Sequence, residues 1–214
     1  MRIGQELIQV QSIVMQYTAR NGTPFVLRPA RPQDAEGIIQ SLREVAAEGI
    51  YLAAEEPRWT RKDVLAMIRE MSFYPFILVV EADRKVVGHA FVQRGSLKKN
   101  QHAAGIGMLV IPGYRGIGIG TAMLEYIDSW ARSHQLKKLF LSVFSSNQQA
   151  LALYHKSGFL QEGIRPGQFI IDNHYVSEIV MGKPLDPILQ RDDDDLKSAK
   201  TMPEEIAKTK EGEK

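Results

Sequence analysis

The sequence predicts an α/β (α+β) fold built on a central mixed, mostly antiparallel sheet of six to seven strands, with helices on both faces. Short apolar segments rich in β-branched residues follow one another across tight turns, which favours antiparallel neighbours. Two longer segments, 32–49 and 119–130, space their apolar residues as amphipathic helices do. The second helix lies between two apolar strands, and a helical crossover makes the strands that it joins parallel. Six to seven strands is close to the usual size of a sheet.

Length and composition limit the class of protein. A chain of 214 residues fits one domain with tails. We expect a tail with the first hairpin strand at 1–22, a single folded domain at 23–184 and a charged, disordered tail at 185–214. The net charge of +2 gives no reason to expect a nucleic-acid partner. The absence of cysteine excludes disulfides, thiolate metal sites and a cysteine nucleophile, and it suits the cytoplasm.

Two further classes of partner are not expected. The chain has no apolar run near the ~20 residues of a membrane span, so we expect no membrane partner. The four aspartates at 192–195 lack the spacing of a folded metal loop, so we expect no metal.

The first elements follow from local signals. Apolar residues in Ser12–Thr18 and Phe25–Arg28 predict two strands, and Asn21-Gly22 between them is a strong hairpin signal. Met1–Val10 has helical spacing over a short stretch only. We expect a mobile tail there or, alternatively, a helical extension that supports a homodimer.

Two helices are predicted next. Pro32 begins the first, and its apolar face ends at Gly49. Thr60-x-x-Asp63 resembles a capping box and begins a second helix that runs to about Met71. The remaining strands are expected at 76–80, 86–93, 139–144, 159–162 and 175–181, with a turn at 83–85 and a loop at 168–173.

The most informative stretch begins with the apolar strand Ile106–Ile111, which Pro112-Gly113 ends. Gly116, Gly118 and Gly120 follow at alternate positions and lead into a helix. A strand, a glycine-rich turn and a helix start present free backbone N–H groups to an anion. Glycine leaves room for a phosphate to approach those groups. The stretch therefore predicts a phosphate-binding loop.

Three glycine motifs compete for this loop. A Walker-type loop requires Lys and then Ser or Thr after its second glycine, but Ile119-Gly120 stands there. A dinucleotide fingerprint requires a glycine where Thr121 stands and a downstream acid that Gln135–Lys138 lacks. The pattern Arg-x-x-Gly-x-Gly is matched completely, by Arg115, Gly118 and Gly120.

This last pattern resembles the pyrophosphate loop of the GNAT superfamily of N-acetyltransferases. A second stretch, with Asn147, Ala150-Leu151, Tyr154 and Gly158-Phe159, resembles the next signature of the same superfamily. The resemblance covers roughly 25–183. It implies an acyltransferase that moves an acetyl group from acetyl-coenzyme A (acetyl-CoA) to a primary amine by direct attack in a ternary complex. The alternative is a non-catalytic acetyl-CoA-binding sensor or scaffold domain.

The resemblance also implies roles for particular residues. Tyr154 matches the general acid, although a core aromatic is the alternative reading of that residue. A backbone N–H of Leu109 or Val110 would be the oxyanion donor. The strands on either side of the glycine-loop helix would splay apart to admit the pantetheine arm. The implied cofactor-binding residues are Met108, Leu109, Val110, Arg115, Gly116, Ile117, Gly118, Ile119, Gly120, Thr121, Asn147 and Tyr154.

The general base and the acceptor are the open questions. Protein-alanine acetyltransferases of the superfamily carry a Glu where this chain has Ser142, and a serine is not a useful base. We expect deprotonation through water or by a group from elsewhere in the chain, with Glu81, His102 and His174 as candidates. The segment between the first two helices commonly borders the acceptor site in this superfamily, which nominates Tyr51, Glu55 and Glu56. The acceptor amine would belong to a small molecule or a protein N-terminus.

Overall fold

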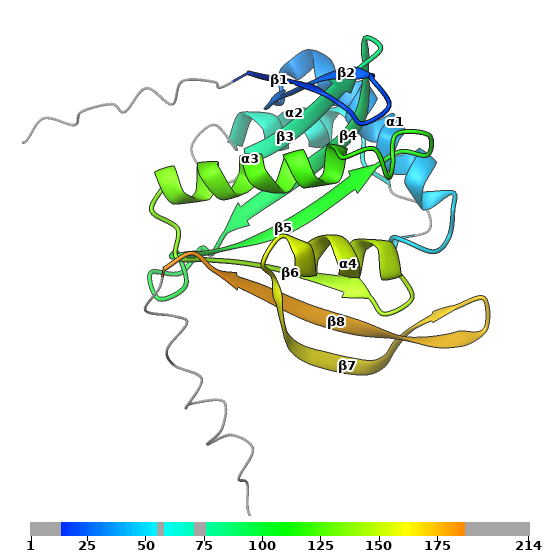
Figure 1. Ribbon diagram of the computed structural model, residues 1–214, viewed down its shortest axis with the longest axis vertical. Coiled ribbons are helices and arrows are strands. Elements are labelled where there is room, and N and C mark those ends of the chain that lie inside the picture. The colour runs from blue at the N-terminus through cyan, green and yellow to red at the C-terminus, as the bar shows by residue number, and fades with distance from the viewer. Residues whose placement is uncertain (1–13, 55–57, 71–75, 187–214) are drawn as a thin grey trace, which may run out of the picture.

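The computed structural model describes residues 14–54, 58–70 and 76–186, and helices separate groups of strands along the chain (Figure 1). The strands are β1 Met15–Thr18, β2 Pro24–Pro29, β3 Phe76–Ala82, β4 Lys85–Arg94, β5 Ala103–Val110, β6 Lys138–Phe144, β7 Leu160–Ile171 and β8 His174–Pro184. The helices are a 3-10 turn at Pro32–Asp34, α1 Ala35–Ala46, α2 Arg61–Glu70, α3 Ile119–Ser133 and α4 Gln148–Lys156.

The strands form one sheet of eight in the order β1-β2-β3-β4-β5-β6-β8-β7. Among its seven neighbouring pairs β5–β6 is parallel and the others are antiparallel, which confirms the predicted mixed, mostly antiparallel sheet. The predicted count of six to seven strands is too low by at least one. The predicted N-terminal hairpin is present, since the turn at Asn21-Gly22 folds β1 back onto β2 from Met15↔Leu27 to Thr18↔Pro24.

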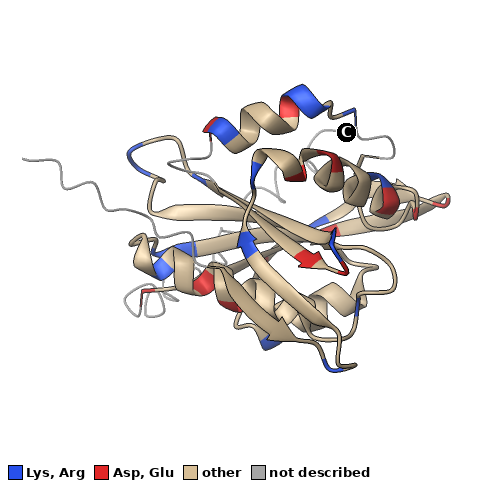
Figure 2. Ribbon diagram, turned by 90° about the horizontal axis from the view of Figure 1, so that it is seen from above, with Lys and Arg blue, Asp and Glu red and all other residues tan. Residues whose placement is uncertain are grey.

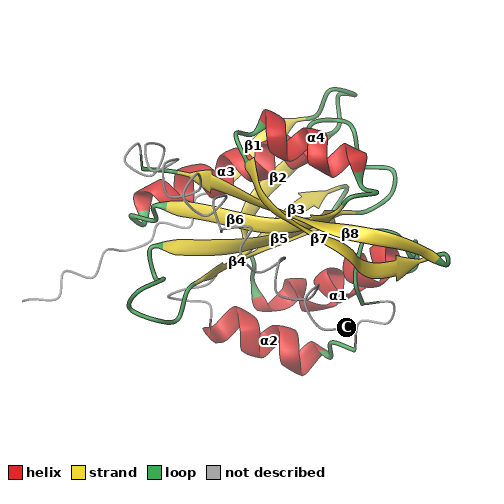
Figure 3. Cartoon of the chain, turned by 90° about the horizontal axis from the view of Figure 1, so that it is seen from below, coloured by secondary structure: helices red, strands yellow, loops and turns green. Residues whose placement is uncertain are grey.

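Helices cover both faces of the sheet, as predicted. Helices α1 and α2 lie on one face, and α3 and α4 lie on the other (Figure 3). Their starts use the local signals in the sequence. The Thr60 N–H donates to the Asp63 carboxylate at 2.8 Å, and the Asp63 N–H donates back to the Thr60 hydroxyl at 3.3 Å, which is the predicted capping box.

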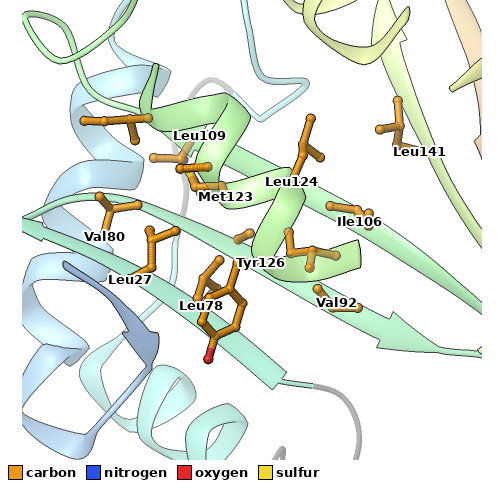
Figure 4. Packing of buried hydrophobic residues seen from close by; sticks show 14 of the residues in the cluster. Leu27, Leu78, Val80, Val92, Ile106, Leu109, Met123, Leu124, Tyr126 and Leu141 are labelled. Carbon is orange, nitrogen blue, oxygen red and sulfur yellow. The ribbon is translucent and has the colours of Figure 1, made fainter. Parts of the chain in front are cut away.

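Each helical layer buries its own apolar cluster against the sheet. On the α3 side, Leu78 and Val80 of β3 and Ile106 of β5 pack with Met123 and its neighbours on α3 (Figure 4). On the α1 side, the second cluster contains Ile38, Ile39, Val64, Ile77 and Val79. The central strands are therefore held by apolar packing on both faces, and this packing fixes the strands that border the site.

The carboxyl-terminal hairpin corrects one sequence expectation. The loop predicted at 168–173 is wrong, because β7 continues to Ile171 and the turn is only Asp172-Asn173. Both turn residues have positive φ, 48° and 60°, as a tight two-residue hairpin requires. A register shift between Arg165 and Phe169 accommodates Pro166-Gly167 within the strand.

Several expectations fall on segments outside the described residues. These are the tail at 1–10, the aspartates at 192–195 and the rest of the charged segment from 187 onward. The last described residues pack on the domain, since Leu185 is buried and its N–H donates to the Lys137 carbonyl at 2.8 Å.

The charge distribution agrees with the small net charge. Basic and acidic residues are interspersed along the described chain (Figure 2). Within 14–54, 58–70 and 76–186, each helix is too short or too polar to cross a membrane.

Candidate active site

The parallel strands β5 and β6 separate at one end, as the family resemblance implied. They pair only from Ala103↔Lys138 to Gly105↔Phe140. Beyond these pairs a cavity of about 480 Å³ opens between Ile106–Val110 of β5 and Ser142–Phe144 of β6. The start of α3 and one side of α4 form the rest of its wall, and Tyr51 and Leu52 reach it from the segment after α1.

Backbone alternation along β5 decides which N–H groups face this cavity. The Ile111 N–H donates to the Val87 carbonyl at 2.9 Å, and the Gly95 N–H donates to the Ala103 carbonyl at 3.0 Å. Odd-numbered residues of β5 therefore direct their backbone groups toward β4. Leu109 is one of them. Val110 directs its N–H to the opposite side, toward the cavity.

The glycine loop has the backbone geometry of an anion site. Gly116 and Gly118 have φ of 73° and 103°, values that L side chains rarely adopt. Gly118 is the N-cap residue of α3 and no side chain caps the helix, so the first N–H groups of α3 remain open to a ligand. A Cβ on Gly120 would lie 2.9 Å from Leu153 Cδ2, so this glycine allows α3 to approach α4 closely.

Arg115 is held by the protein itself rather than directed freely at a ligand. Its guanidinium makes two hydrogen bonds to the Glu48 carboxylate, at 2.7 and 2.5 Å, and its Nε donates to the Val110 carbonyl at 2.6 Å. The guanidinium also lies 4.7 Å from the centre of the Tyr51 ring. Arg115 thus ties the glycine loop to α1, to the end of β5 and to Tyr51.

The second signature places Asn147 and Tyr154 on the same wall of the cavity. The Asn147 side chain accepts a hydrogen bond from the Ala150 N–H at 3.1 Å, so Asn147 caps α4 as predicted. Tyr154, two turns further along, is only 8% exposed, and burial raises the pKa of its hydroxyl to about 12. That hydroxyl makes no hydrogen bond to another described residue, and its side chain lines the cavity.

Most of the predicted cofactor-binding residues meet at this cavity. Two of the twelve do not line it: Ile119 is buried in the core, and Ile117 uses its carbonyl to bind the Arg20 N–H at 2.9 Å. Those that line the cavity are Met108, Leu109, Val110, Arg115, Gly116, Gly118, Gly120, Thr121, Asn147 and Tyr154. Of the predicted acceptor residues, Tyr51 lines the cavity, and Glu55 and Glu56 lie outside the described residues.

The structure does not bring the three candidate bases to the cavity. The Glu81 carboxylate accepts from Arg28 at 2.7 Å and borders a different pocket, beside β1 and β2. His102 precedes β5 at the end away from the splay, where its carbonyl accepts the Lys137 N–H at 2.7 Å. His174 is exposed at the β7–β8 turn, with its ring nitrogen 2.6 Å from the Asp172 carbonyl.

One acid lies closer to the cavity than these candidates. Glu178 on β8 is directly opposite Phe144 on β6, so it shares a sheet face with Phe144 and with Ser142, both of which line the cavity. Hydrogen bonding from Ser142, and then from Arg165, lowers the pKa of Glu178 below its usual value. Arg165 on β7 donates to the carboxylate at 2.7 Å. The alternation of side chains along β8 indicates which residues share a face with Glu178, but local sequence does not predict that β8 pairs with β6.

Among the described residues, no group of three or more His, Cys, Asp or Glu side chains is placed to hold a metal ion.

Comparisons with known proteins agree with this geometry. A family model described as the acetyltransferase (GNAT) family matches residues 41–159. The L-amino acid N-acetyltransferase AaaT of Escherichia coli (strain K12) is 30% identical over 112 residues, which are 48% of this chain and 67% of that protein. The acetyltransferase of GNAT family from Streptococcus pneumoniae matches with a TM-score of 0.70 at 24% identity, over 75% of this chain and 98% of that chain. The structure of yncA from Salmonella typhimurium with its cofactor acetyl-CoA matches with a TM-score of 0.70 at 19% identity, over 76% of this chain and 95% of that chain.

The family match spans more than half of the chain, so the chain belongs to the acetyltransferase (GNAT) family. It is an acyltransferase, and the resemblance inferred from the glycine loop and the Asn147–Phe159 stretch is confirmed at the level of the family.

Proposed function

We propose that the protein transfers an acetyl group from acetyl-CoA to a primary amine by direct attack within a ternary complex. The observation that carries the proposal is that one cavity is lined by the glycine loop, by the unpaired edge of β5 and by Tyr154. A phosphate site, a strand edge and a proton donor are what a phosphopantetheine thioester requires, and here they meet in the cleft between β5 and β6.

The residues present fit acetyl-CoA. Gly116 and Gly118 leave the first N–H groups of α3 accessible to a pyrophosphate. The cavity-facing backbone of Met108 and Val110 offers strand-type hydrogen bonds to the amides of the pantetheine arm. Asn147 borders the same channel. The donor supplies an activated acetyl group and a thiolate leaving group.

Two groups of this chain would act on the charge that develops during transfer. The Val110 N–H points into the cavity and would stabilise negative charge on the thioester oxygen, whereas the Leu109 N–H is directed to β4. Tyr154 would donate its proton to the departing thiolate. Its raised pKa of about 12 keeps it protonated at neutral pH, and a thiolate with an ordinary pKa of about 8.5 is basic enough to be protonated there.

The attacking amine must first lose a proton, since an alkyl ammonium has a pKa of about 10.4. Glu178 supports this step better than the other acids and histidines considered. It is ionised at neutral pH, and Ser142 stands between it and the cavity. A proton would pass from the ammonium, through the Ser142 hydroxyl or a water molecule, to the Glu178 carboxylate. This arrangement places the carboxylate one strand away from the position where protein-alanine acetyltransferases carry it.

The acceptor is proposed as an amine that enters from the side of Tyr51, Leu52 and Phe144. The name of the E. coli relative makes free amino acids the first class to test, with protein N-terminal peptides as the second. Both carry an α-amino group that an ionised carboxylate can attract.

A direct assay tests the proposal. The full chain is incubated with acetyl-CoA and a panel of amino acids, N-terminal peptides and small polyamines, and the release of free thiol is followed. Thiol release that depends on one amine class supports an N-acetyltransferase. Tight binding of acetyl-CoA without amine-dependent release would instead support the sensor alternative.

A further inference from the structure

The edge strand β1 and the turn that follows it bring a second element to the glycine loop. The turn between β1 and β2 is fixed internally, since the Ala19 N–H donates to the Thr23 carbonyl at 2.8 Å. Tyr17 stacks on Phe25 with ring centres 5.2 Å apart, which holds the two strands of the hairpin in register. The Arg20 N–H, at the tip, donates to the Ile117 carbonyl at 2.9 Å. The tip of the hairpin is thus bonded to the glycine loop itself.

This bond places the Arg20 side chain over the open side of the loop. Arg20 lines the cavity together with Gly116 and Gly118. A Cβ built on Gly118 would lie 4.0 Å from Arg20 Cγ, so the arginine stem passes next to the N-terminus of α3. The guanidinium is exposed and makes no hydrogen bond or ion pair with another described residue. It is therefore available to a ligand.

The other cations of the cavity are placed differently. The guanidinium of Arg115 is already bound by both oxygens of Glu48, at 2.7 and 2.5 Å. Lys156 lines the cavity from the last turn of α4. The N–H groups at the start of α3 provide only partial positive charge. A full charge beside Gly118 comes from Arg20.

We propose that Arg20 binds the pyrophosphate of the donor, so that the N-terminal hairpin is a part of the acetyl-CoA site. The inference rests on the proposed donor. The chemistry is a charge-assisted contact between a guanidinium and phosphate oxygens, which adds to the backbone N–H groups of the loop.

Calorimetric titration of the full chain with coenzyme A tests this role without requiring turnover. Arg20→Ala should weaken coenzyme A binding roughly tenfold, the scale of one charge-assisted phosphate contact, and Arg20→Lys should recover part of the affinity. Arg84→Ala is the matched control, since Arg84 is an exposed arginine at the tip of another hairpin and does not line this cavity. It should bind coenzyme A as the wild type does, and thermal melts should show all three variants folded.

Truncated ligands identify the phosphate involved. Dephospho-coenzyme A keeps the pyrophosphate and lacks the 3′-phosphate, so the Arg20→Ala penalty should persist with it. Pantetheine lacks both, so the penalty should vanish. A penalty lost already with dephospho-coenzyme A, one retained with pantetheine, or no penalty with coenzyme A would each overturn the assignment while leaving the proposed function intact. A wild-type chain that does not bind coenzyme A would overturn both.

Discussion

The replacement Tyr154→Phe separates a catalytic hydroxyl from a structural aromatic ring. The ring packs 5.9 Å from the centre of Phe159 and is nearly buried, and the variant keeps that packing. The hydroxyl makes no hydrogen bond to another described residue, so its removal should cost less than about 1.5 kcal/mol of folding free energy. If it protonates the leaving thiolate, turnover should fall by roughly 10²–10⁴-fold, which is about 2.7–5.5 kcal/mol of activation free energy.

The assay follows thiol release at saturating acetyl-CoA and acceptor, with calorimetry and thermal melts on the same protein. We expect a lower kcat, an almost unchanged affinity for acetyl-CoA and a melting temperature near that of the wild type. Tyr126→Phe is the control, because Tyr126 is also buried with its pKa raised to about 12, but it packs from α3 into the core and does not line the cavity. Near-normal kcat for Tyr154→Phe would refute the acid role and leave water as the proton source.

Three further predictions test separate parts of the site and the fold. Gly118→Val should weaken acetyl-CoA binding by roughly tenfold or more in calorimetry, because a side chain at φ 103° strains the loop and covers the N–H groups. Gly158→Val is the control, because Gly158 has φ 86° but lies outside the loop, so its replacement should lower only the stability. Equal losses of affinity in the two variants would contradict the loop assignment. Glu178→Gln should lower kcat/KM by roughly 10²-fold at neutral pH, with the deficit shrinking toward pH 10 as the amine loses its proton unaided; a deficit independent of pH would argue against proton transfer to Glu178. Burial lowers the pKa of His89 to about 3, so between pH 6.5 and 3 the unfolded state binds a proton that the folded state does not. The free energy of unfolding should therefore decrease by about 1.4 kcal/mol for each unit by which the pH is lowered in that range. Denaturant titrations at several pH values should show this pH dependence reduced by that amount in His89→Leu, and an unchanged pH dependence would refute the assignment to His89.

Local sequence signals were sufficient to predict the elements that form the donor site. The alternate glycines and Asn147 act through their own backbone and their neighbours in the chain, so their roles at the starts of α3 and α4 follow from short-range rules. The parallel pairing of β5 and β6 follows from the helix that joins them.

Contacts between distant segments were not predictable in the same way. Glu48 and Arg115 are 67 residues apart, and their pairing ties the glycine loop to the end of α1. Arg20 reaches that loop only because β1 joins the edge of the sheet. Glu178 approaches Ser142 through the β6–β8 register, which no periodicity within either strand specifies.

The full length of β7 was not predictable from local signals, and the loop expected at 168–173 is strand up to Ile171. Pro166-Gly167 carries the strongest turn-forming residues of its region, yet the pairing of β7 with β8 continues past it through a bulge. The hairpin is consequently longer than predicted and brings Arg165 opposite Glu178.

In the proposed reaction, acetyl-CoA and the amine react directly while both occupy the cavity between β5 and β6. Initial rates with both substrates varied, combined with mass spectrometry of the protein after incubation with acetyl-CoA alone, test it most directly. Direct transfer should give intersecting double-reciprocal lines and an unmodified chain. Parallel lines together with an acetyl group attached covalently to the protein would contradict it.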